Sequence, residues 1–171
     1  PKTKEATDWH KFVKGIDETK KGKKEVKIAI CGKYFASGNF SLEDSYVCVI
    51  EAIKHAAWKL KVNPVIEWFN VEEMEDENKR AGVEAELLKC DGIIVPQGWG
   101  SRGVEGKLKV VEFARVNKIP YFGLCFGMQM ACIEAARNLC GIRGASSTEF
   151  GPTNEPVVGL MTEWMRGNEL E

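Results

Sequence analysis

The chain has 171 residues, of which 44% are hydrophobic and 29% are charged. This balance is typical of one globular domain with a hydrophobic core, and it excludes a disordered or collagen-like chain. The 24 Lys and Arg residues are matched by 25 Asp and Glu residues, giving a net charge of -1, so we expect no binding to nucleic acid or to an anionic membrane surface.

The sequence contains few residues that could bind a metal or act as a base. It has two histidines, His10 and His55, and six cysteines, none of them in a C-x-x-C pair or a Cys/His cluster with zinc spacing. We therefore expect no metal site and no disulfide framework, and reduced cysteines indicate a cytoplasmic location. No run of 18 apolar residues occurs, and the N-terminus lacks an apolar h-region, so neither a membrane span nor a signal peptide is expected.

An amphipathic helix is predicted first along the chain, over residues 7–18, with Trp9, Phe12, Val13 and Ile16 on one face. A lysine-rich stretch with a glycine follows it and is typical of a solvated linker. We interpret residues 1–25 as a linker helix with a basic linker, and residues 26–171 as the main domain.

The main domain alternates short apolar runs with amphipathic segments. The apolar runs predict buried strands at residues 26–31, 64–69, 90–96 and 119–124. Helical spacing predicts helices at 43–60, 81–89, 107–117 and 127–140, the last with Met128, Ala131, Cys132, Ala135 and Leu139 facing inward. The remaining polar or glycine-rich stretches, 72–80 and 97–106, are predicted as loops.

This alternation predicts an α/β fold with a doubly wound, mainly parallel sheet of flavodoxin-like strand order 2-1-3-4-5. Ligands of such sheets bind beyond the carboxyl ends of the strands. The loops to search for a site are therefore 32–42, 96–106 and 123–127.

One of these loops carries a nucleophile pattern, Gly123-x-Cys125-x-Gly127, between a predicted strand and a predicted helix. This is a cysteine version of the nucleophile elbow, a turn so tight that small residues are needed on both sides. The helix N-terminus favours a thiolate, and the amide of Phe126 could donate to an oxyanion. The alternative interpretation is a buried structural thiol, but the two glycines favour a nucleophile.

The segment Pro96–Gly100 follows the neighbouring strand and is rich in glycine. It could bring a second backbone amide toward the thiolate, and Gly98 is the best candidate for that donor. A plain flexible loop is the alternative.

Taken together, these segments resemble a known family. GLCFGMQ (123–129) is similar to the nucleophile motif of class I glutamine amidotransferases. Within that family the chain resembles the glutaminase domain of CTP synthase from about residue 9 to about residue 163, on segments that include SYVCVIEAIKHAAW (45–58), GSRGVEGK (100–107) and ASSTEF (145–150).

The resemblance implies that Cys125 attacks the side-chain amide carbon of L-glutamine, releases ammonia and leaves a thioester that water hydrolyses. It implies that the amides of Gly98 and Phe126 stabilise the oxyanion. The residues implied to bind the substrate are Phe126, Gly127, Met128, Gln129 and Glu149. For Glu149, which would hold the α-ammonium group, a solvated loop carboxylate is an equally good interpretation.

The resemblance also implies partners beyond the glutaminase chemistry. The segment Arg102, Gly103, Val104 and Glu105 matches a lid region associated with activation by GTP. No cofactor is implied for this chain. The ammonia would pass to a separate synthetase domain, which uses Mg-ATP to convert UTP to CTP, in a parent enzyme that is a homo-oligomer.

Two departures from the family pattern affect activity. Gln97 stands where the family has glycine, and its side chain restricts the backbone near Gly98. The family's His-x-Glu pair, which completes the catalytic triad, follows the STEF segment, whereas this sequence ends at Glu171. We therefore expect a C-terminally truncated domain that is weak or inactive alone, with His10 and His55 in structural positions.

Two other classes of function stay open at this point. One is a stand-alone protein with the same elbow, such as a thiol hydrolase, redox sensor or chaperone, in which Glu43 or Asp44 would pair with Cys125. The other is a non-catalytic regulatory or assembly module that keeps the fold.

Overall fold

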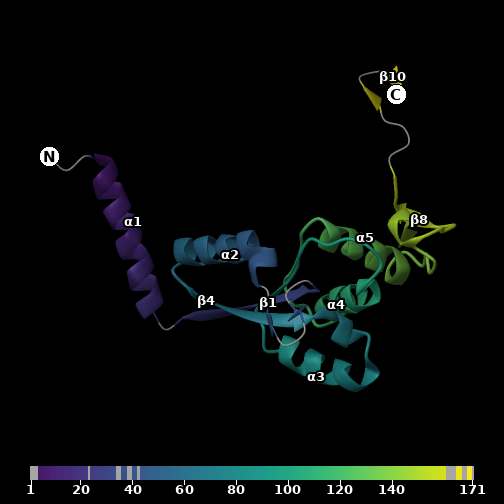
Figure 1. Ribbon diagram of the computed structural model, residues 1–171, viewed down its shortest axis with the longest axis horizontal. Coiled ribbons are helices and arrows are strands. Elements are labelled where there is room, and N and C mark those ends of the chain that lie inside the picture. Colours follow the sequence, from purple (N-terminus) through teal and green to yellow (C-terminus); the bar gives the residue numbers. More distant parts are fainter. Residues whose placement is uncertain are drawn as a thin grey trace.

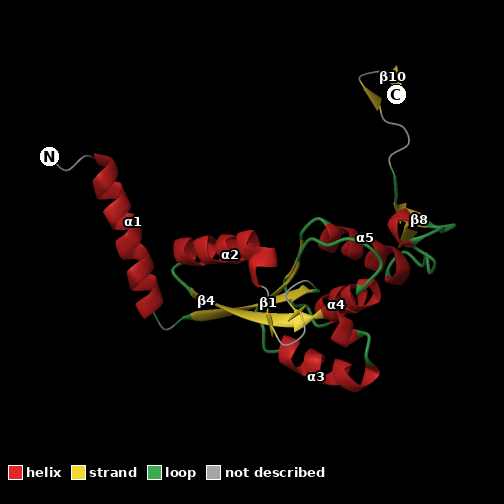
Figure 2. Ribbon diagram, viewed as in Figure 1, coloured by secondary structure: helices red, strands yellow, loops and turns green. Residues whose placement is uncertain are grey.

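The computed structural model describes residues 4–22, 24–33, 36–37, 40–41, 43–160, 165–166 and 169–170. Its centre is a four-stranded parallel sheet with the order β4-β1-β5-β6 (Figures 1 and 2). The strands are β1 (Glu25–Gly32), β4 (Asn63–Asn70), β5 (Gly92–Val95) and β6 (Tyr121–Gly123). Counted along the chain these are strands 2-1-3-4, so the predicted doubly wound α/β arrangement is confirmed for all four.

Alternate side chains of β1 enter two separate cores, because successive residues of a strand point to opposite faces of the sheet. Ala29 and Cys31 pack with residues of α3 (Glu77–Leu87) and α4 (Val104–Val116). Ile30 packs with residues of α2 (Val47–Leu60). In Figure 1, α2 lies on one side of the sheet and α3 on the other. The continuous apolar strands of the sequence follow from this two-sided cover.

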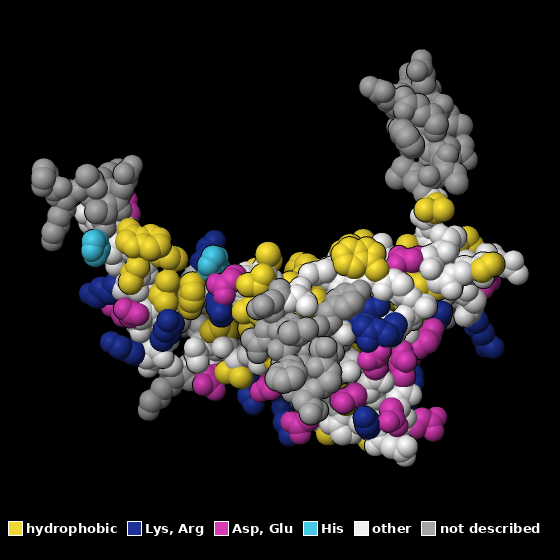
Figure 3. All heavy atoms as spheres, in the orientation of Figure 1, with side chains coloured by type: hydrophobic (Ala, Val, Ile, Leu, Met, Phe, Trp, Pro, Cys, Tyr) yellow, Lys and Arg dark blue, Asp and Glu magenta, His cyan; other side chains and the backbone are white. Residues whose placement is uncertain are grey.

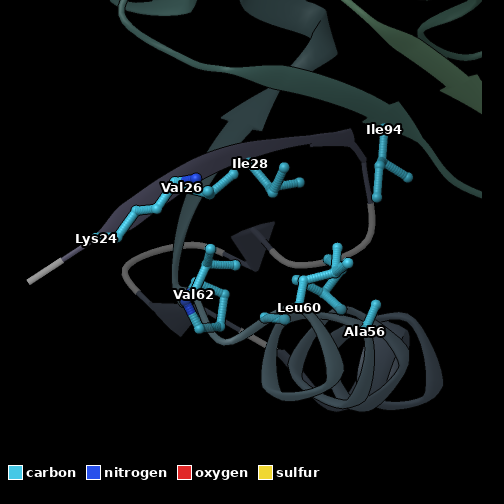
Figure 4. Close-up of a pocket in the computed structure, with 10 residues that line it drawn as sticks. Lys24, Val26, Ile28, Ala56, Leu60, Val62 and Ile94 are labelled. Carbon is cyan, nitrogen blue, oxygen red and sulfur yellow. The ribbon is translucent and has the colours of Figure 1, made fainter. Parts of the chain in front are cut away.

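The face under α2 is only partly covered. An apolar groove of about 500 Å³ remains between α2 and the sheet, with Ile28 on β1, Leu60 on α2 and Ile94 on β5 among its lining residues (Figure 4). Leu60, the last residue of α2, is 72% exposed at this groove.

Beyond β6, α5 (Phe126–Asn138) packs on α4 through Val104, Leu108 and Val111 on one side and Phe126, Met130 and Ile133 on the other. A bidentate ion pair closes this interface: Arg115 Nη2 lies 2.7 Å from Glu134 Oε1 and Nε lies 3.2 Å from Oε2. Glu134 is buried, and its carboxylate also accepts a bond from Asn138 Nδ2 at 2.9 Å.

The N-terminal helix α1 (Lys4–Lys21) lies at the end of the molecule opposite α5 (Figure 1). Its apolar residues Trp9 and Phe12 are exposed and form a patch on the surface (Figure 3). The helix is longer than predicted at both ends. Because β1 begins at Glu25, a boundary near residue 25 is compatible with this layout and stays a prediction.

The short elements lie outside the central sheet. They are β2 (Ala36–Ser37), β3 (Phe40–Ser41), β7 (Ser146–Ser147), β8 (Pro156–Val158), β9 (Met165–Arg166), β10 (Glu169–Leu170), and the 3₁₀ turns η1 (Glu43–Tyr46), η2 (Val71–Met74) and η3 (Thr148–Phe150). No helix in the described part of the chain is long and apolar enough to cross a membrane.

The prediction of a loop over residues 72–80 is wrong. Its first residues belong to η2, which buries Val71 and Met74, and α3 begins at Glu77. Asp76 caps α3 by accepting a hydrogen bond from the Asn78 amide at 2.9 Å. Asp is a preferred N-cap residue, but among so many acidic residues the sequence did not distinguish it as the cap. Likewise, α4 begins at Val104, inside the predicted loop 97–106.

The inward face predicted for α5 is also wrong. Met128 and Leu139 are 51% and 63% exposed, whereas Met130 and Ile133 are fully buried. Because α5 contains several small residues, its sequence is compatible with more than one apolar stripe. Packing against α4 decides which of them is buried.

We predict that Arg115→Met lowers the free energy of unfolding by about 2 kcal/mol, because it leaves the buried Glu134 carboxylate without its cation. Chemical denaturation measures this change. The matched control is Arg80→Met, which removes an exposed pair with Glu84 on α3 and should change stability by less than about 0.5 kcal/mol. Equal effects of the two substitutions would contradict the assignment of the α4–α5 ion pair as a stabilising contact.

Candidate active site

The turn from β6 into α5 has the form that the glycine spacing predicts. We call residues 123–127 the cysteine elbow. Cys125 is the N-cap of α5 with φ 52° and ψ -106°, and its side chain is exposed. A non-glycine residue in this region carries strain of roughly 1–3 kcal/mol, which is characteristic of functional positions.

Both glycines of the cysteine elbow are required by close backbone contacts. A Cβ at Gly123 would lie 2.5 Å from the Gly127 carbonyl carbon, and a Cβ at Gly127 would lie 1.9 Å from the Val95 oxygen. The turn is further fixed by two hydrogen bonds. The Leu124 amide donates to the Val95 oxygen at 2.9 Å, and the Tyr121 hydroxyl donates to the Gly127 oxygen at 2.7 Å.

The first turn of α5 leaves one amide unused. The amides of Gly127, Met128 and Gln129 donate to the carbonyl oxygens of Leu124 and Cys125. The Phe126 amide donates to no acceptor in the part of the chain that the structure describes. It belongs to the peptide that directly follows Cys125, so it can donate to an anion at the thiol.

The second predicted donor lies beside the first. Gly98 belongs to the glycine-rich loop (residues 96–103) between β5 and α4, and a Cβ on it would lie 3.6 Å from Phe126 Cδ1. Gly98 is buried, and among the described residues its amide also has no acceptor. Gly98 and Phe126, which carry the two candidate oxyanion donors, are therefore neighbours through the ring of Phe126, and Gln97 is half-buried beside Gly98.

Two buried lysines, which the sequence did not single out, lie under the glycine-rich loop. Lys33 Nζ donates to the carbonyl oxygens of Trp99 and Arg102. Lys107 Nζ lies 3.4 Å from the Pro96 oxygen and 4.7 Å from the centroid of the Phe126 ring. Burial, together with the nearby charge of Lys33, lowers the pKa of Lys107 to about 8.

The available sequence signal for Lys107 was its spacing. It follows Val104 by three residues and precedes Val111 by four, on the stripe of α4 that is buried. A lysine on such a stripe is ordinarily placed at its edge, because burying an ammonium group is unfavourable.

The candidate substrate residues Gln129 and Glu149 line one cavity of about 260 Å³, together with Ser147 and Val158. Glu149 lies in η3, where its amide donates to Ser147 Oγ at 3.1 Å. Its Oε1 accepts a hydrogen bond from the Gly100 amide at 2.7 Å. Glu149 therefore contacts the glycine-rich loop as well as the cavity.

The segment 102–105 joins the glycine-rich loop to α4. The Arg102 guanidinium lies 2.9 Å from Glu72 Oε1 on η2. Gly103, with φ 72°, is the N-cap of α4, and Val104 is buried as its first residue. Glu105 forms a 3.1 Å ion pair with Arg137 of α5. Ion pairs therefore connect this segment to two neighbouring elements, η2 and α5.

Other candidates lie elsewhere or outside the described side chains. His10 is on α1, and His55 on α2 lines a cavity with residues of α1, so neither lies at the cysteine elbow. The side chains of Glu43 and Asp44 lie outside the described residues. No group of three potential metal ligands occurs in the described ranges.

Comparison with known proteins shows the family of the chain. The family model described as glutamine amidotransferase class-I matches residues 41–168. The CTP synthase of Brucella anthropi is 56% identical over 147 residues, which are 86% of this chain and 26% of that protein. The CTP synthase of Sinorhizobium medicae is 55% identical over the same length and shares.

Among solved structures, the Trypanosoma brucei CTPS glutaminase domain with bound acivicin is similar, with a TM-score of 0.71 and 40% sequence identity. The match covers 80% of this chain and 50% of that one. Against the curated relatives, the chain spans about a quarter of their length.

We predict that Gly127→Ala destabilises the protein by more than about 3 kcal/mol or prevents folding, because its Cβ would overlap the Val95 oxygen. The control is Gly82→Ala in α3, where a Cβ meets no atom within 4 Å and should stabilise the helix by about 0.5–1 kcal/mol. Thermal unfolding followed by circular dichroism compares them. A Gly127→Ala variant as stable as the Gly82→Ala variant would refute the close contact.

Proposed function

The chain belongs to the class I glutamine amidotransferase family, and on that basis we propose that Cys125 hydrolyses the side-chain amide of L-glutamine. The observation that carries the proposal is the cysteine elbow itself. The exposed thiol of Cys125 lies at a helix N-terminus, directly before the Phe126 amide, and Gly98 lies against the ring of Phe126. The amides of Gly98 and Phe126 have no acceptor among the described residues. This arrangement suits a reaction in which negative charge develops on a carbonyl oxygen.

The reaction proceeds in two steps. Cys125 Sγ bonds to the amide carbon of glutamine while the two amides hold the oxyanion, and the C–N bond then breaks. The nitrogen leaves as ammonia with the proton of the thiol, and a γ-glutamyl thioester remains. Water hydrolyses the thioester, which gives glutamate and restores the thiol.

The substrate's amino-acid end is proposed to bind in the cavity lined by Gln129 and Glu149. One carboxylate oxygen of Glu149 accepts from Gly100, and the other can accept from an α-ammonium group. Gly127 and Met128 join Cys125 to Gln129 in the first turn of α5, and in this proposal the exposed Met128 side chain contacts the aliphatic part of the bound glutamine.

The released ammonia is proposed to serve the conversion of UTP to CTP in a synthetase domain that binds Mg-ATP. The names of the curated relatives, CTP synthases in each case, support this. In the same proposal, the parent enzyme is a homo-oligomer and GTP acts through the segment Arg102, Gly103, Val104 and Glu105. The ion pairs of Arg102 and Glu105 with neighbouring elements would carry that signal.

The test is covalent labelling of the 171-residue chain with 6-diazo-5-oxo-L-norleucine, an electrophile shaped like glutamine. We predict slow labelling confined to Cys125, because no histidine lies at the cysteine elbow, and slower labelling still when L-glutamine is added. Peptide mass spectrometry locates the adduct, and Cys125→Ser should abolish it. Labelling spread over the exposed Cys48, Cys132 and Cys140 without protection by glutamine would refute the function.

Glu149→Gln tests the substrate cavity. In this variant the side-chain amide oxygen at position 149 can still accept from the Gly100 amide, but the negative charge of the carboxylate is lost. We therefore predict that protection of Cys125 by L-glutamine needs roughly 10–100-fold more ligand, because a hydrogen bond to a charged group contributes about 1.5–3 kcal/mol. Glu112→Gln, on the exposed face of α4, is the control and should leave protection as in the wild type. Unaltered protection in Glu149→Gln would exclude this carboxylate as the ammonium ligand.

A further inference from the structure

Lys107 is in an unfavourable position for a lysine. Its side chain is fully buried, and it forms no ion pair with any residue that the structure describes. Its ammonium group donates to the Pro96 oxygen and lies over the face of the Phe126 ring. Burying an ammonium group without a carboxylate is unfavourable, and a methionine would fill the same space without that penalty.

The position of the ammonium group suggests what it does. It lies directly below Gly98, since a Cβ there would be 2.9 Å from Lys107 Nζ. It also contacts the ring of Phe126, the first residue of α5. One buried cation therefore touches the glycine-rich loop at Gly98 and the cysteine elbow at Phe126, and neither of these residues has an acceptor for its amide in the part of the chain that the structure describes.

The neighbouring peptide shows how an internal cation orients the loop. The Trp99 oxygen accepts from the buried Lys33 ammonium, while the amide of the same peptide, on Gly100, donates to Glu149. A trans peptide holds its C=O and N–H in opposite directions, so drawing the oxygen inward turns the amide outward. The Lys107 ammonium likewise donates to the Pro96 oxygen at the start of the same loop, and the amide of that peptide belongs to Gln97, the residue before Gly98.

We propose that Lys107 is a positioning residue, whose buried ammonium group holds the glycine-rich loop against the first turn of α5 so that the amides of Gly98 and Phe126 converge near Cys125. This role deepens the proposed function and rests on it. Lys107 does not touch the reacting atoms. It acts through the backbone of the loop and through the ring of Phe126.

Titration of Lys107 gives the role a signature that packing alone would lack. The charged groups and thiols that influence it are Lys33 and Cys31 at the end of β1 and Cys125 before α5. Because its pKa is lowered to about 8, the ammonium form dominates below that pH and is lost above it. The geometry of the loop should change over the same range.

The first experiment follows the amide signals of Gly98 and Gly100 in the ¹⁵N-labelled full chain by NMR. In the wild type the Gly98 signal should titrate with a midpoint near pH 8, and in Lys107→Met it should start from a different position and lack that titration. A titration that persists in Lys107→Met belongs to a thiol and overturns the proposal. The control Lys109→Met, on the same helix with its ammonium on the Met74 oxygen, should leave both signals in place.

The second experiment compares two electrophiles at Cys125. Lys107→Met should slow labelling by 6-diazo-5-oxo-L-norleucine at least about tenfold, since removal of one oxyanion donor slows hydrolases by roughly 10²–10³. Alkylation by iodoacetamide, which forms no oxyanion, should keep its wild-type rate. Equal slowing with both reagents would show a general loss of structure and overturn the positioning role. Failure of the wild type to react with the glutamine analogue would refute the proposed function, while the NMR titration still decides the role of Lys107.

Discussion

Two glycines, Gly123 and Gly127, determine the structure around Cys125, because neither position has room for a Cβ. Gly127 lies so close to the Val95 oxygen that no other residue fits there without movement of β5 or α5. This contact presses the first turn of α5 onto the end of the sheet. The contact fixes where α5 starts, and the apolar residues and the Arg115–Glu134 ion pair hold the rest of the helix on α4.

The ends of the strands form a second level of organisation. Residues after β1, β5 and β6 supply Lys33, the glycine-rich loop and the cysteine elbow, as expected at the carboxyl edge of a parallel sheet. Cations lie below the loop and Glu149 lies beside it. The loop is thereby shaped by charges on both sides rather than by regular secondary structure.

Much of this arrangement was predictable from the sequence, because its signals are local. The elbow follows from two glycines around one cysteine, and the strand order follows from the alternation of apolar runs and helices. The buried stripe of α5 was not predictable in this way, and the spacing of Lys107 on α4 indicates a buried stripe without showing that the ammonium group itself is buried. Both depend on packing between α4 and α5, which spacing within one helix does not specify. The contact of Glu149 with Gly100 spans 49 residues of sequence and has no local signal.

The single hydrogen bond between Glu149 and Gly100 has a thermodynamic consequence. In the proposed function, Glu149 takes part in two equilibria at once, because it accepts from a backbone amide and also lines the cavity proposed for the substrate. If binding of the substrate's ammonium group weakens the bond between Glu149 and Gly100, then by linkage the intact bond weakens the binding of that ammonium group by the same factor. In this proposal, occupancy of the cavity and the conformation of the loop are coupled through one peptide held between an ammonium group and a carboxylate.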